Sequence, residues 1–423
     1  MLILVVVIFC VLLVMGMPIA YCMALAASAV IISNPSLPST IIAQKIYTAV
    51  DSFSFIAIPL FMMAGSLMNS TGITDKIINF FKNLVGHITG GLAHTCVLTG
   101  MLMAGVSGSS VADASAIATV MVPQLEKNGY DRGFACALIS SAGSLGPIIP
   151  PSIIMIVYSG VVSISVGKLF MAGVIPGILL GIGMLVYCYF YAKRHGFKRG
   201  TFAGWKRVGK SFLGSLGALV MPLIIIGGIL TGIVTATESG ILAIVYGIAY
   251  GFLSGGLTLR KLWNNINEAV AGAAQPMIII SFAALLAYVL TYYDMGTVVG
   301  NFMTGLTDSS AVVLIVIFVI IFVAGMFIES TAILLMLVPF FAPLISVYNF
   351  DPIHFATVCI ISLVLGGITP PVGIVMYVVS GVTRTDLKPI IRQIIPFILI
   401  FSLGVLLVIF VPQVSTLLPA LVH

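Results

Sequence analysis

The sequence predicts an all-α polytopic membrane protein built from two inverted repeats. Three observations predict this fold: the composition, a series of landmark residues that recurs in both halves, and a basic segment between the halves. The chain of 423 residues is 60% hydrophobic and only 7% charged, with a mean hydropathy of +1.24, whereas a soluble domain carries about 25% charged residues. At about 20 residues per crossing, the apolar runs amount to roughly ten to twelve membrane elements.

The chain begins with an apolar block at residues 1–33. This block has no basic region at its start, and its apolar run continues to Ile32. A secretory signal combines a basic start with a short apolar core. We therefore expect a retained membrane helix, although the block is long for one span.

A basic segment at residues 193–210 divides the chain almost equally. It holds seven of the eighteen Lys and Arg residues and no acidic residue. Loops rich in Lys and Arg stay in the cytoplasm, so we expect a cytoplasmic linker between a first repeat at 1–192 and a second at 211–423, each with scaffold helices. This loop accounts for the basic balance of the chain, and no nucleic-acid surface is needed to explain it.

The two repeats share landmarks in the same order. Matching pairs, offset by 216 to 220 residues, are Pro59 and Pro276, Asp113 and Glu329, Pro123 and Pro339, Gly146 and Gly366, and Pro150-Pro151 and Pro370-Pro371. One proline pair is weak evidence because membrane helices often contain proline. The ordered series indicates a duplication.

The charges of equivalent loops indicate that the copies are inverted. Residues 126–132 hold Lys127 and Arg132, whereas their counterparts at 348–354 hold no basic residue. The next pair of loops reverses this pattern, because basic residues are concentrated at 383–392 in the second half. Equivalent loops therefore prefer opposite sides of the membrane.

Each repeat is predicted to contain one re-entrant hairpin and one broken transmembrane helix. The hairpins are expected at about 90–125 and 311–347, and the broken helices at about 134–165 and 354–382. Gly and Pro interrupt these apolar segments and cannot continue a helix. Non-helical backbone survives at membrane depth only where protein or a wet cavity surrounds it, and paired interruptions in two halves indicate a transport site.

The broken segments bring helix ends and hydroxyl groups into the protein. Helix N-termini favour a carboxylate, and helix C-termini favour a small cation. The hydroxyls available in the first half belong to Ser107, Ser109, Ser110 and Ser152, and Thr369 adds one in the second half. These groups can serve either kind of ligand.

Two acids within apolar segments, Asp113 and Glu329, follow the two hairpin tips. An acid near the bilayer centre costs about 2.5–3.5 kcal/mol on insertion scales. One interpretation is a helix cap in the first turn of the returning helix. The other is a cation ligand or a substrate partner, and we expect Glu329, more than Asp113, to face a cavity.

The repeated core holds no Lys or Arg between positions 83 and 126, 133 and 167, or 311 and 383. The charge of an anionic ligand must then be met by helix N-termini, hydroxyls and co-bound cations. This favours cation-coupled symport, and sodium is preferred over protons because few titratable groups are present.

Other classes of site are less well supported. The six cysteines are scattered and show no metal-ligand spacing. A serine hydrolase would need Ser109 or Ser144 beside His94, oriented by a third group, and no Ser–His pair recurs in the second half. We therefore expect that the chain is not an enzyme.

The motifs resemble those of one family over essentially the whole chain. They are Ser107-Gly108-Ser109-Ser110-Val111-Ala112-Asp113, Gly146-Pro147-Ile148-Ile149-Pro150-Pro151-Ser152, Thr235-Ala236-Thr237-Glu238-Ser239 and Gly366-Gly367-Ile368-Thr369-Pro370-Pro371. This set resembles the large membrane (M) subunit of TRAP (tripartite ATP-independent periplasmic) transporters, within the wider ion-transporter superfamily.

The resemblance implies an elevator-type transporter in the bacterial inner membrane. A domain with both hairpins and both broken helices would slide against a scaffold. The implied partners are a small four-helix membrane subunit and a periplasmic substrate-binding protein that delivers an organic acid.

The resemblance also implies two or more sodium ions. Residues implied for the first sodium site are Ser107, Gly108, Ser109, Asp113, Gly143, Gly146 and Pro147. Those for the second are Gly325, Glu329, Gly366 and Thr369. Those implied for the substrate are Ser107, Ser110, Ser152 and Glu329.

Sialic acid is the first expectation for the substrate, and a C4-dicarboxylate or another carboxylate is the next. Two alternatives within the same superfamily remain open. They are a stand-alone sodium-coupled carboxylate carrier and a sodium/proton antiporter.

Overall fold

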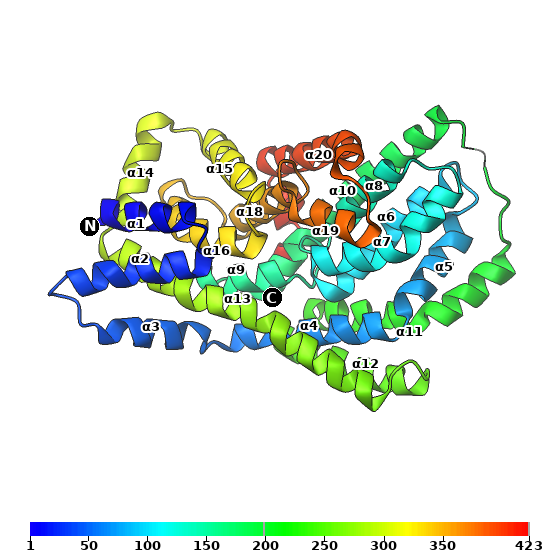
Figure 1. The fold of residues 1–423 in the computed structure, drawn as a ribbon, viewed down its shortest axis with the longest axis horizontal. Coiled ribbons are helices and arrows are strands. Elements are labelled where there is room, and N and C mark those ends of the chain that lie inside the picture. Colours follow the sequence, from blue (N-terminus) through cyan, green and yellow to red (C-terminus); the bar gives the residue numbers. More distant parts are fainter. Residues whose placement is uncertain (198, 422–423) are drawn as a thin grey trace.

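The computed structural model describes residues 1–197 and 199–421. Lys198 of the predicted linker and residues 422–423 of the predicted second repeat lie outside this range. The described residues form helices, turns and loops without any strand (Figure 1). Among them, five helices are long and apolar enough to cross a membrane, or up to seven if each of two bent pairs counts as one span. This confirms the predicted all-α polytopic fold.

One set of helices packs on the long helix α13. We call it the scaffold group, and it consists of α2 (Ile19–Ser33), α3 (Thr40–Val50), α4 (Phe53–Ser70), α12 (Ala236–Leu253) and α13 (Leu259–Tyr292). In Figure 1, α3 and α4 run one after the other beside α13. Small residues and methionines fill much of this interface, including Ala57, Ala64 and Ala273, which are buried.

A second set, the hairpin group, contains the interrupted segments. Its members are α6 (Gly91–Ser107), α7 (Ser110–Lys127), α8 (Arg132–Gly143), α9 (Ile153–Val162), α15 (Ser310–Gly325), α16 (Ser330–Phe341), α18 (Pro352–Gly367) and α19 (Ile374–Thr383). Helix α8 packs on α6 and α7, and α18 packs on α15 and α16. The two groups meet where α9 contacts α4 and where α16 contacts α13.

The remaining helices complete the chain. They are α1 (Leu2–Val14), α5 (Ile73–Val85), α10 (Val166–Arg194), α11 (Trp205–Leu230), α14 (Met295–Leu306), α17 (Pro343–Val347), α20 (Leu387–Phe410), α21 (Gln413–Thr416) and the short 3-10 turn Pro419–Leu421. Helix α20 packs on α8, α10 and α18.

Two predicted elements differ in the structure. Residues 1–33 form two helices, because the chain turns at Gly16 (φ 81°) and α2 starts after Pro18. The linker predicted at 193–210 is shorter, because α10 continues to Arg194 and α11 starts at Trp205. The basic residues near these two helix ends can lie at the interface without breaking the helix, since their charged groups reach water.

Local details recur in the two halves after the broken helices. The Ser159 hydroxyl donates to the carbonyl of Ile164, and the Ser380 hydroxyl donates to that of Thr385 at 2.7 Å. Just before each acceptor, Ser163 (φ 59°) and Arg384 (φ 52°) are left-handed. These matched turns add to the sequence evidence for a duplication.

Contacts along the scaffold group identify its two ends. The Thr237 hydroxyl at the start of α12 donates to the carbonyl of Phe53 at the start of α4, at 3.4 Å. A Cβ placed at Gly251, near the end of α12, would lie 3.1 Å from the side chain of Thr71, which follows α4. Helices α4 and α12 therefore run parallel.

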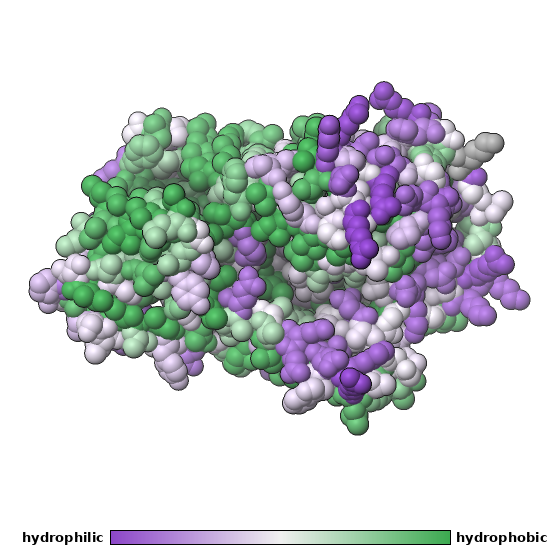
Figure 2. Space-filling view, viewed as in Figure 1, coloured by the Kyte–Doolittle hydropathy of each residue, from purple (hydrophilic) through white to green (hydrophobic). Residues whose placement is uncertain are grey.

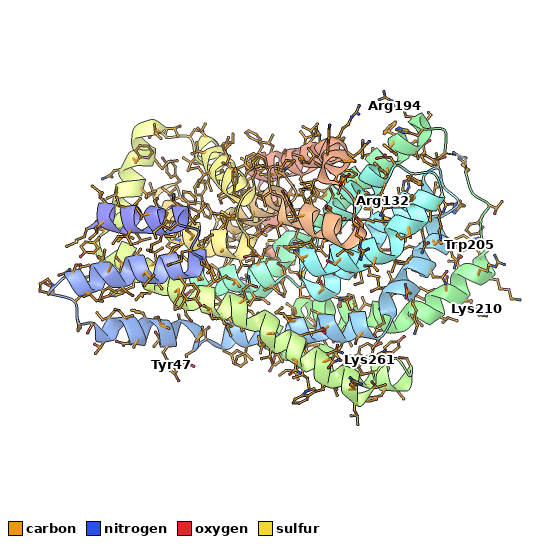
Figure 3. The ribbon with its side chains drawn as sticks, in the orientation of Figure 1. Tyr47, Arg132, Arg194, Trp205, Lys210 and Lys261 are labelled. Atoms are coloured by element: carbon orange, nitrogen blue, oxygen red, sulfur yellow. The ribbon has the colours of Figure 1, made fainter. Side chains whose placement is uncertain are left out.

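Basic residues lie at the end where α4 and α12 finish. Figure 3 labels Arg194, Lys210 and Lys261 in this part of the molecule, and Figure 2 shows hydrophilic residues gathered there. Under the positive-inside rule this is the cytoplasmic end. We call it the inner end, and the opposite end, where α4 begins, the outer end.

The second hairpin touches its broken helix through backbone alone. A Cβ on Gly366 would lie 2.5 Å from Gly325 Cα and 3.0 Å from the Phe322 carbonyl oxygen. No flexible side chain can move aside at this contact. The pair of glycines therefore sets the spacing between α15 and α18.

We expect Gly366→Ala to destabilise the fold by about 1–3 kcal/mol, the usual cost of overpacking. The apparent melting temperature of the purified protein in detergent measures this. Gly381→Ala is the matched control, because Gly381 is also helical and its added Cβ meets no atom within 4 Å. Equal melting temperatures for the two variants would contradict the proposed spacing role.

Candidate functional site

The first hairpin tip is held by its own serines. Ser109 is the N-cap of α7, and its hydroxyl accepts a hydrogen bond from the Ala112 amide at 3.4 Å. The Ser107 hydroxyl donates to Asp113 Oδ1 at 2.6 Å and accepts from the Ser109 amide at 3.1 Å. The tip thus joins the end of α6 to the first turn of α7.

Asp113 is fully buried, and only one of its two oxygens has a partner. No hydrogen-bond donor among the described residues reaches Oδ2. A Cβ at Gly146 would lie 2.9 Å from this oxygen and 3.2 Å from the Gly143 carbonyl oxygen. Two oxygens therefore converge beside Gly146. A small hard cation fits such a place, because it binds carboxylate and carbonyl oxygens.

The role of Asp113 as a helix cap was one of two interpretations of the sequence. In the structure the cap is Ser109, and Asp113 lies in the first turn with its carboxylate turned toward the broken segment. An unpaired buried carboxylate oxygen is costly. This observation favours the cation-ligand interpretation.

The first tip packs directly on the first break. A Cβ at Gly108 would lie 2.5 Å from the Pro151 carbonyl oxygen, and a Cβ at Gly143 would lie 2.6 Å from the Ala114 side chain. Only glycine permits the approach at Gly108, which also has a left-handed φ of 62°. The residues implied for a first sodium site are thus brought together.

Ser152 holds the first break closed. It is fully buried, its hydroxyl donates to the Pro147 carbonyl at 2.6 Å, and it accepts from the Met155 amide at 3.2 Å as the N-cap of α9. It lines none of the cavities described below. The implied role as a substrate contact therefore has no open face in this conformation.

The second tip resembles the first in position but not in its hydrogen bonds. Glu329 is the N-cap of α16, and its two carboxylate oxygens accept from the Ala332 amide and the Thr331 hydroxyl, both at 3.0 Å. The Thr369 hydroxyl donates to the Leu365 carbonyl at 2.7 Å. Both oxygens of Glu329 are thus satisfied, unlike those of Asp113.

A cavity of about 260 Å³ lies between the two tips. Ser109 and Ser110 line it from the first tip, Glu329 and Thr331 from the second, and Pro147 from the first break. The starts of α7 and α16 both reach this cavity. Glu329 therefore faces a cavity, as expected from the sequence.

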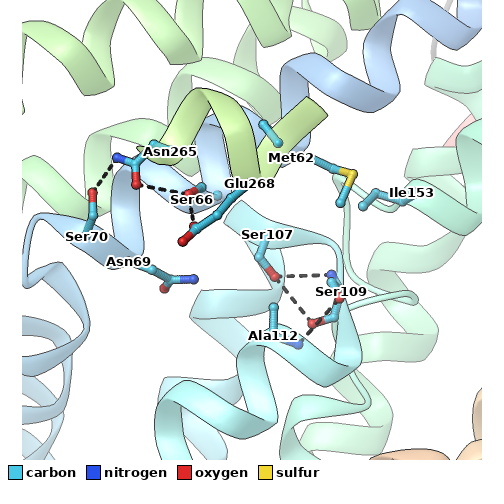
Figure 4. Close-up of a pocket in the computed structure, with 12 residues that line it drawn as sticks. Met62, Ser66, Asn69, Ser70, Ser107, Ser109, Ala112, Ile153, Asn265 and Glu268 are labelled. Carbon is cyan, nitrogen blue, oxygen red and sulfur yellow. Dashed lines mark hydrogen bonds between the residues drawn. The ribbon is translucent and has the colours of Figure 1, made fainter. Parts of the chain in front are cut away.

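A second cavity, of about 430 Å³, continues toward the inner end (Figure 4). Ser107 and Ser109 line it from the first tip, and it shares Met62, Ser109 and Ile153 with the cavity between the tips. The scaffold group supplies its opposite wall. We call these two the central cavity and the inner cavity.

The scaffold wall of the inner cavity is polar, which the sequence analysis missed. The Ser66 hydroxyl lies within hydrogen-bond distance of Glu268 Oε2 (2.9 Å) and Asn265 Oδ1 (3.1 Å), and the Asn265 amide donates to Ser70 Oγ at 2.7 Å (Figure 4). The signal was present in the sequence. Asn265, Glu268 and Gln275 follow a helical spacing within a largely apolar helix, so they share one face.

A third cavity, of about 480 Å³, lies toward the outer end. Helix α13 lines all three cavities with residues spaced three or four apart. They are Asn265, Glu268 and Ala269, then Gly272, Gln275, Pro276 and Ile279, then Ile280, Ala283, Ala284, Ala287, Tyr288 and Thr291. One face of α13 therefore runs past the whole series, from the inner end to the outer end.

Other chemistry finds little support around the tips. No group of three or more His, Cys, Asp or Glu residues in the described parts of the chain is placed to hold a metal ion. His94 Nδ1 lies 2.9 Å from the Gly90 carbonyl oxygen, and the Ser144 hydroxyl donates to the Ser140 carbonyl. These contacts are local to their own helices and do not form a Ser–His pair.

Comparison with known proteins identifies relatives along almost the entire chain. Residues 6–414 match the family model described as "Tripartite ATP-independent periplasmic transporter, DctM component". The chain is 34% identical over 407 residues to the sialic acid TRAP transporter large permease protein SiaM of Vibrio cholerae, covering 96% of this chain and 95% of that protein.

Two further relatives differ in the acid that they are named for. The 2,3-diketo-L-gulonate large permease YiaN of Escherichia coli is 34% identical, with 95% of each chain covered. The isethionate permease DctMQ of Oleidesulfovibrio alaskensis is 33% identical over 96% of this chain, which spans only 64% of that longer protein.

A solved structure shares the fold. The YdaH transporter of Alcanivorax borkumensis, whose crystal structure is described as having an unusual topology, superimposes with a TM-score of 0.67. The match covers 88% of this chain and 87% of that chain at 15% identity. At this identity the likeness concerns the fold alone.

We expect sodium to raise the melting temperature of the purified protein relative to potassium, and Asp113→Asn to remove most of that rise. The rise corresponds to about 2.7 kcal/mol at a sodium concentration about 100 times Kd. Asp351→Asn is the matched control, because Asp351 caps α18 and lines none of the three cavities. A full sodium effect in Asp113→Asn would exclude Asp113 as a ligand.

Proposed function

Because the chain belongs to the DctM family of tripartite ATP-independent periplasmic transporters, we propose that it admits an organic acid into the cell together with sodium ions. Membership establishes a large permease subunit and a multi-pass inner-membrane protein. The substrate, the coupling ion and the movement are proposals. They rest on the two tips and the cavities beside them.

The proposed substrate is an anion held between the tips. The central cavity receives the N-terminal ends of α7 and α16, and no Lys or Arg lines it. Helix N-termini attract carboxylates through unpaired amides and the helix dipole. Ser110 lines this cavity, and Ser107 lines the adjoining inner cavity, so both can donate to the acid.

The relatives are named for sialic acid, 2,3-diketo-L-gulonate and isethionate. Each of these is an organic acid, which supports the class but not one member of it. We propose sialic acid first, and a C4-dicarboxylate or another carboxylate next.

The single observation that carries the sodium proposal is the unpartnered oxygen of Asp113. It lies beside the Gly143 carbonyl in a region where no basic side chain can neutralise it. A sodium ion at this place would neutralise Asp113 and add positive charge next to the central cavity. Sodium and the acid would then stabilise each other electrostatically.

A second sodium ion is proposed where the second tip meets the second break, near Gly325, Gly366 and Thr369. Support here is the backbone contact between the two segments. Because Glu329 is already satisfied by two hydrogen bonds, we expect it to act on the substrate side of the tip more than on this ion.

We propose an elevator movement in which the hairpin group slides along α13. The inner cavity meets the central cavity, so this conformation offers the tips to the inner end. A shift toward the outer end would offer the same tips to the third cavity. A small four-helix membrane subunit and a periplasmic binding protein are the proposed partners, as the tripartite family description suggests.

The alternative is a carrier that works without partners, either a sodium-coupled carboxylate carrier or a sodium/proton antiporter. It would use the same tips and the same ions. Dependence on the binding protein separates the two proposals.

We expect proteoliposomes with the chain, the small subunit and the binding protein to take up an acid from a panel of sialic acid, succinate, 2,3-diketo-L-gulonate and isethionate. Uptake should require an inward sodium gradient, and potassium should not replace it. Equal uptake in sodium-free buffer would contradict sodium coupling. Undiminished uptake by this chain alone would support the stand-alone carrier.

We expect Ser107→Ala and Glu329→Gln each to reduce uptake by roughly 10- to 100-fold, because hydrogen bonds to charged groups contribute about 1.5–3 kcal/mol. Ser309→Ala is the matched control, since Ser309 is a helix N-cap whose side chain makes no capping bond. Surface labelling and membrane yield should be equal for all three variants. Wild-type uptake in both tip variants would show that the tips do not bind the cargo.

A further inference from the structure

The cavity toward the outer end has a wall from each helix group. Phe55, Ile280 and Tyr288 line it from the scaffold group, and Gly160 and Leu335 line it from the hairpin group. We call it the outer cavity. Its floor is closed toward the central cavity by a tight contact, since a Cβ on Gly160 would lie 2.2 Å from the Phe55 ring.

One basic side chain, Lys45 of α3, lines the outer cavity. Its ammonium lies 4.8 Å from the centroid of the Tyr288 ring, a cation–π distance that orients the charged group along α13. The residues that line this cavity include no acid. Within the described residues, the ion pair found is Arg132 with Glu126, so no acid neutralises Lys45.

The polar neighbours of Lys45 in the cavity are hydroxyls. Thr48 and Ser52 contribute theirs from the scaffold side, and Thr291 adds one near the end of α13. An ammonium surrounded by hydroxyl donors suits an anion with several oxygens. The cavity volume of about 480 Å³ is large enough for a small organic acid.

The charges at the two ends of the cavity series are opposite. Glu268 lines the inner cavity, and Lys45 lines the outer cavity, with the tips between them. At about 4 Å and an effective dielectric constant of about 20, one unit charge contributes about 4 kcal/mol to another. An anion is therefore attracted at the outer end and repelled at the inner end.

We propose that Lys45 forms a reception site for the carboxylate or sulfonate group of the incoming acid, before the acid reaches the hairpin tips. This inference rests on the proposed function. A lysine suits a passing ligand, because its ammonium makes a point contact and lacks the paired donors with which arginine clamps a carboxylate. The hydroxyls of Ser52 and Thr291 would share the remaining oxygens.

The test uses the complete reconstituted system and the acid from the panel above that the wild type takes up. Lys45→Gln should raise the concentration of loaded binding protein that gives half-maximal uptake by about tenfold, which corresponds to about 1.4 kcal/mol. Lys45→Arg should stay near the wild type, since it keeps the charge. Lys168→Gln is the matched control, because Lys168 is an exposed lysine that lines none of the three cavities.

Two further arms separate the acid from other partners of a lysine. Uptake is compared in vesicles of neutral lipid and of mixed neutral and anionic lipid, and the defect of Lys45→Gln should be equal in both. Docking of the unloaded binding protein, measured by surface plasmon resonance, should be unchanged.

Wild-type uptake by Lys45→Gln would overturn the inference, and so would a defect confined to anionic vesicles or a matching loss of docking. If the wild type takes up none of the panel, the proposed function itself has failed. That result is distinct from a functioning wild type with an indifferent Lys45.

Discussion

The structure depends on one constraint, the need to satisfy uncoiled backbone inside a membrane. Each hairpin tip solves this by packing on the broken helix of its own half. Gly108 approaches the Pro151 carbonyl, and Gly325 meets Gly366 through backbone atoms. Ser152 closes the first break with a hydrogen bond to Pro147. Non-helical segments in lipid would be prohibitive without such partners, so the site and the fold have the same physical cause.

The sequence predicted the interrupted elements well, because their causes are local. Gly and Pro interrupt a helix wherever they occur together, and the tips at 107–110 and 325–329 lie where the residue types require them. The same local reasoning predicted that Glu329 would face a cavity. The break at Gly16 and Pro18 carried a similar signal, which the uniform hydrophobicity of residues 1–33 obscured.

The rest of the site could not be predicted, because it depends on which helices become neighbours. Glu268 and Lys45 acquire meaning only when α13 and α3 are placed beside the hairpin group. The difference between Asp113 and Glu329 also required coordinates. The two acids occupy equivalent places in sequence, yet one is a satisfied cap and the other has a free oxygen. Spacing along a chain does not reveal which hydrogen bonds a carboxylate will find.

The seam between Gly325 and Gly366 bears on the speed of the protein. Two main chains in direct contact have no rotamers to freeze, so little conformational entropy is lost when a ligand settles beside them. The ordering was completed once, at the time the polypeptide acquired its native shape. Every later passage of cargo inherits that preorganised cradle, and a carrier built this way can turn over without rebuilding its own interior.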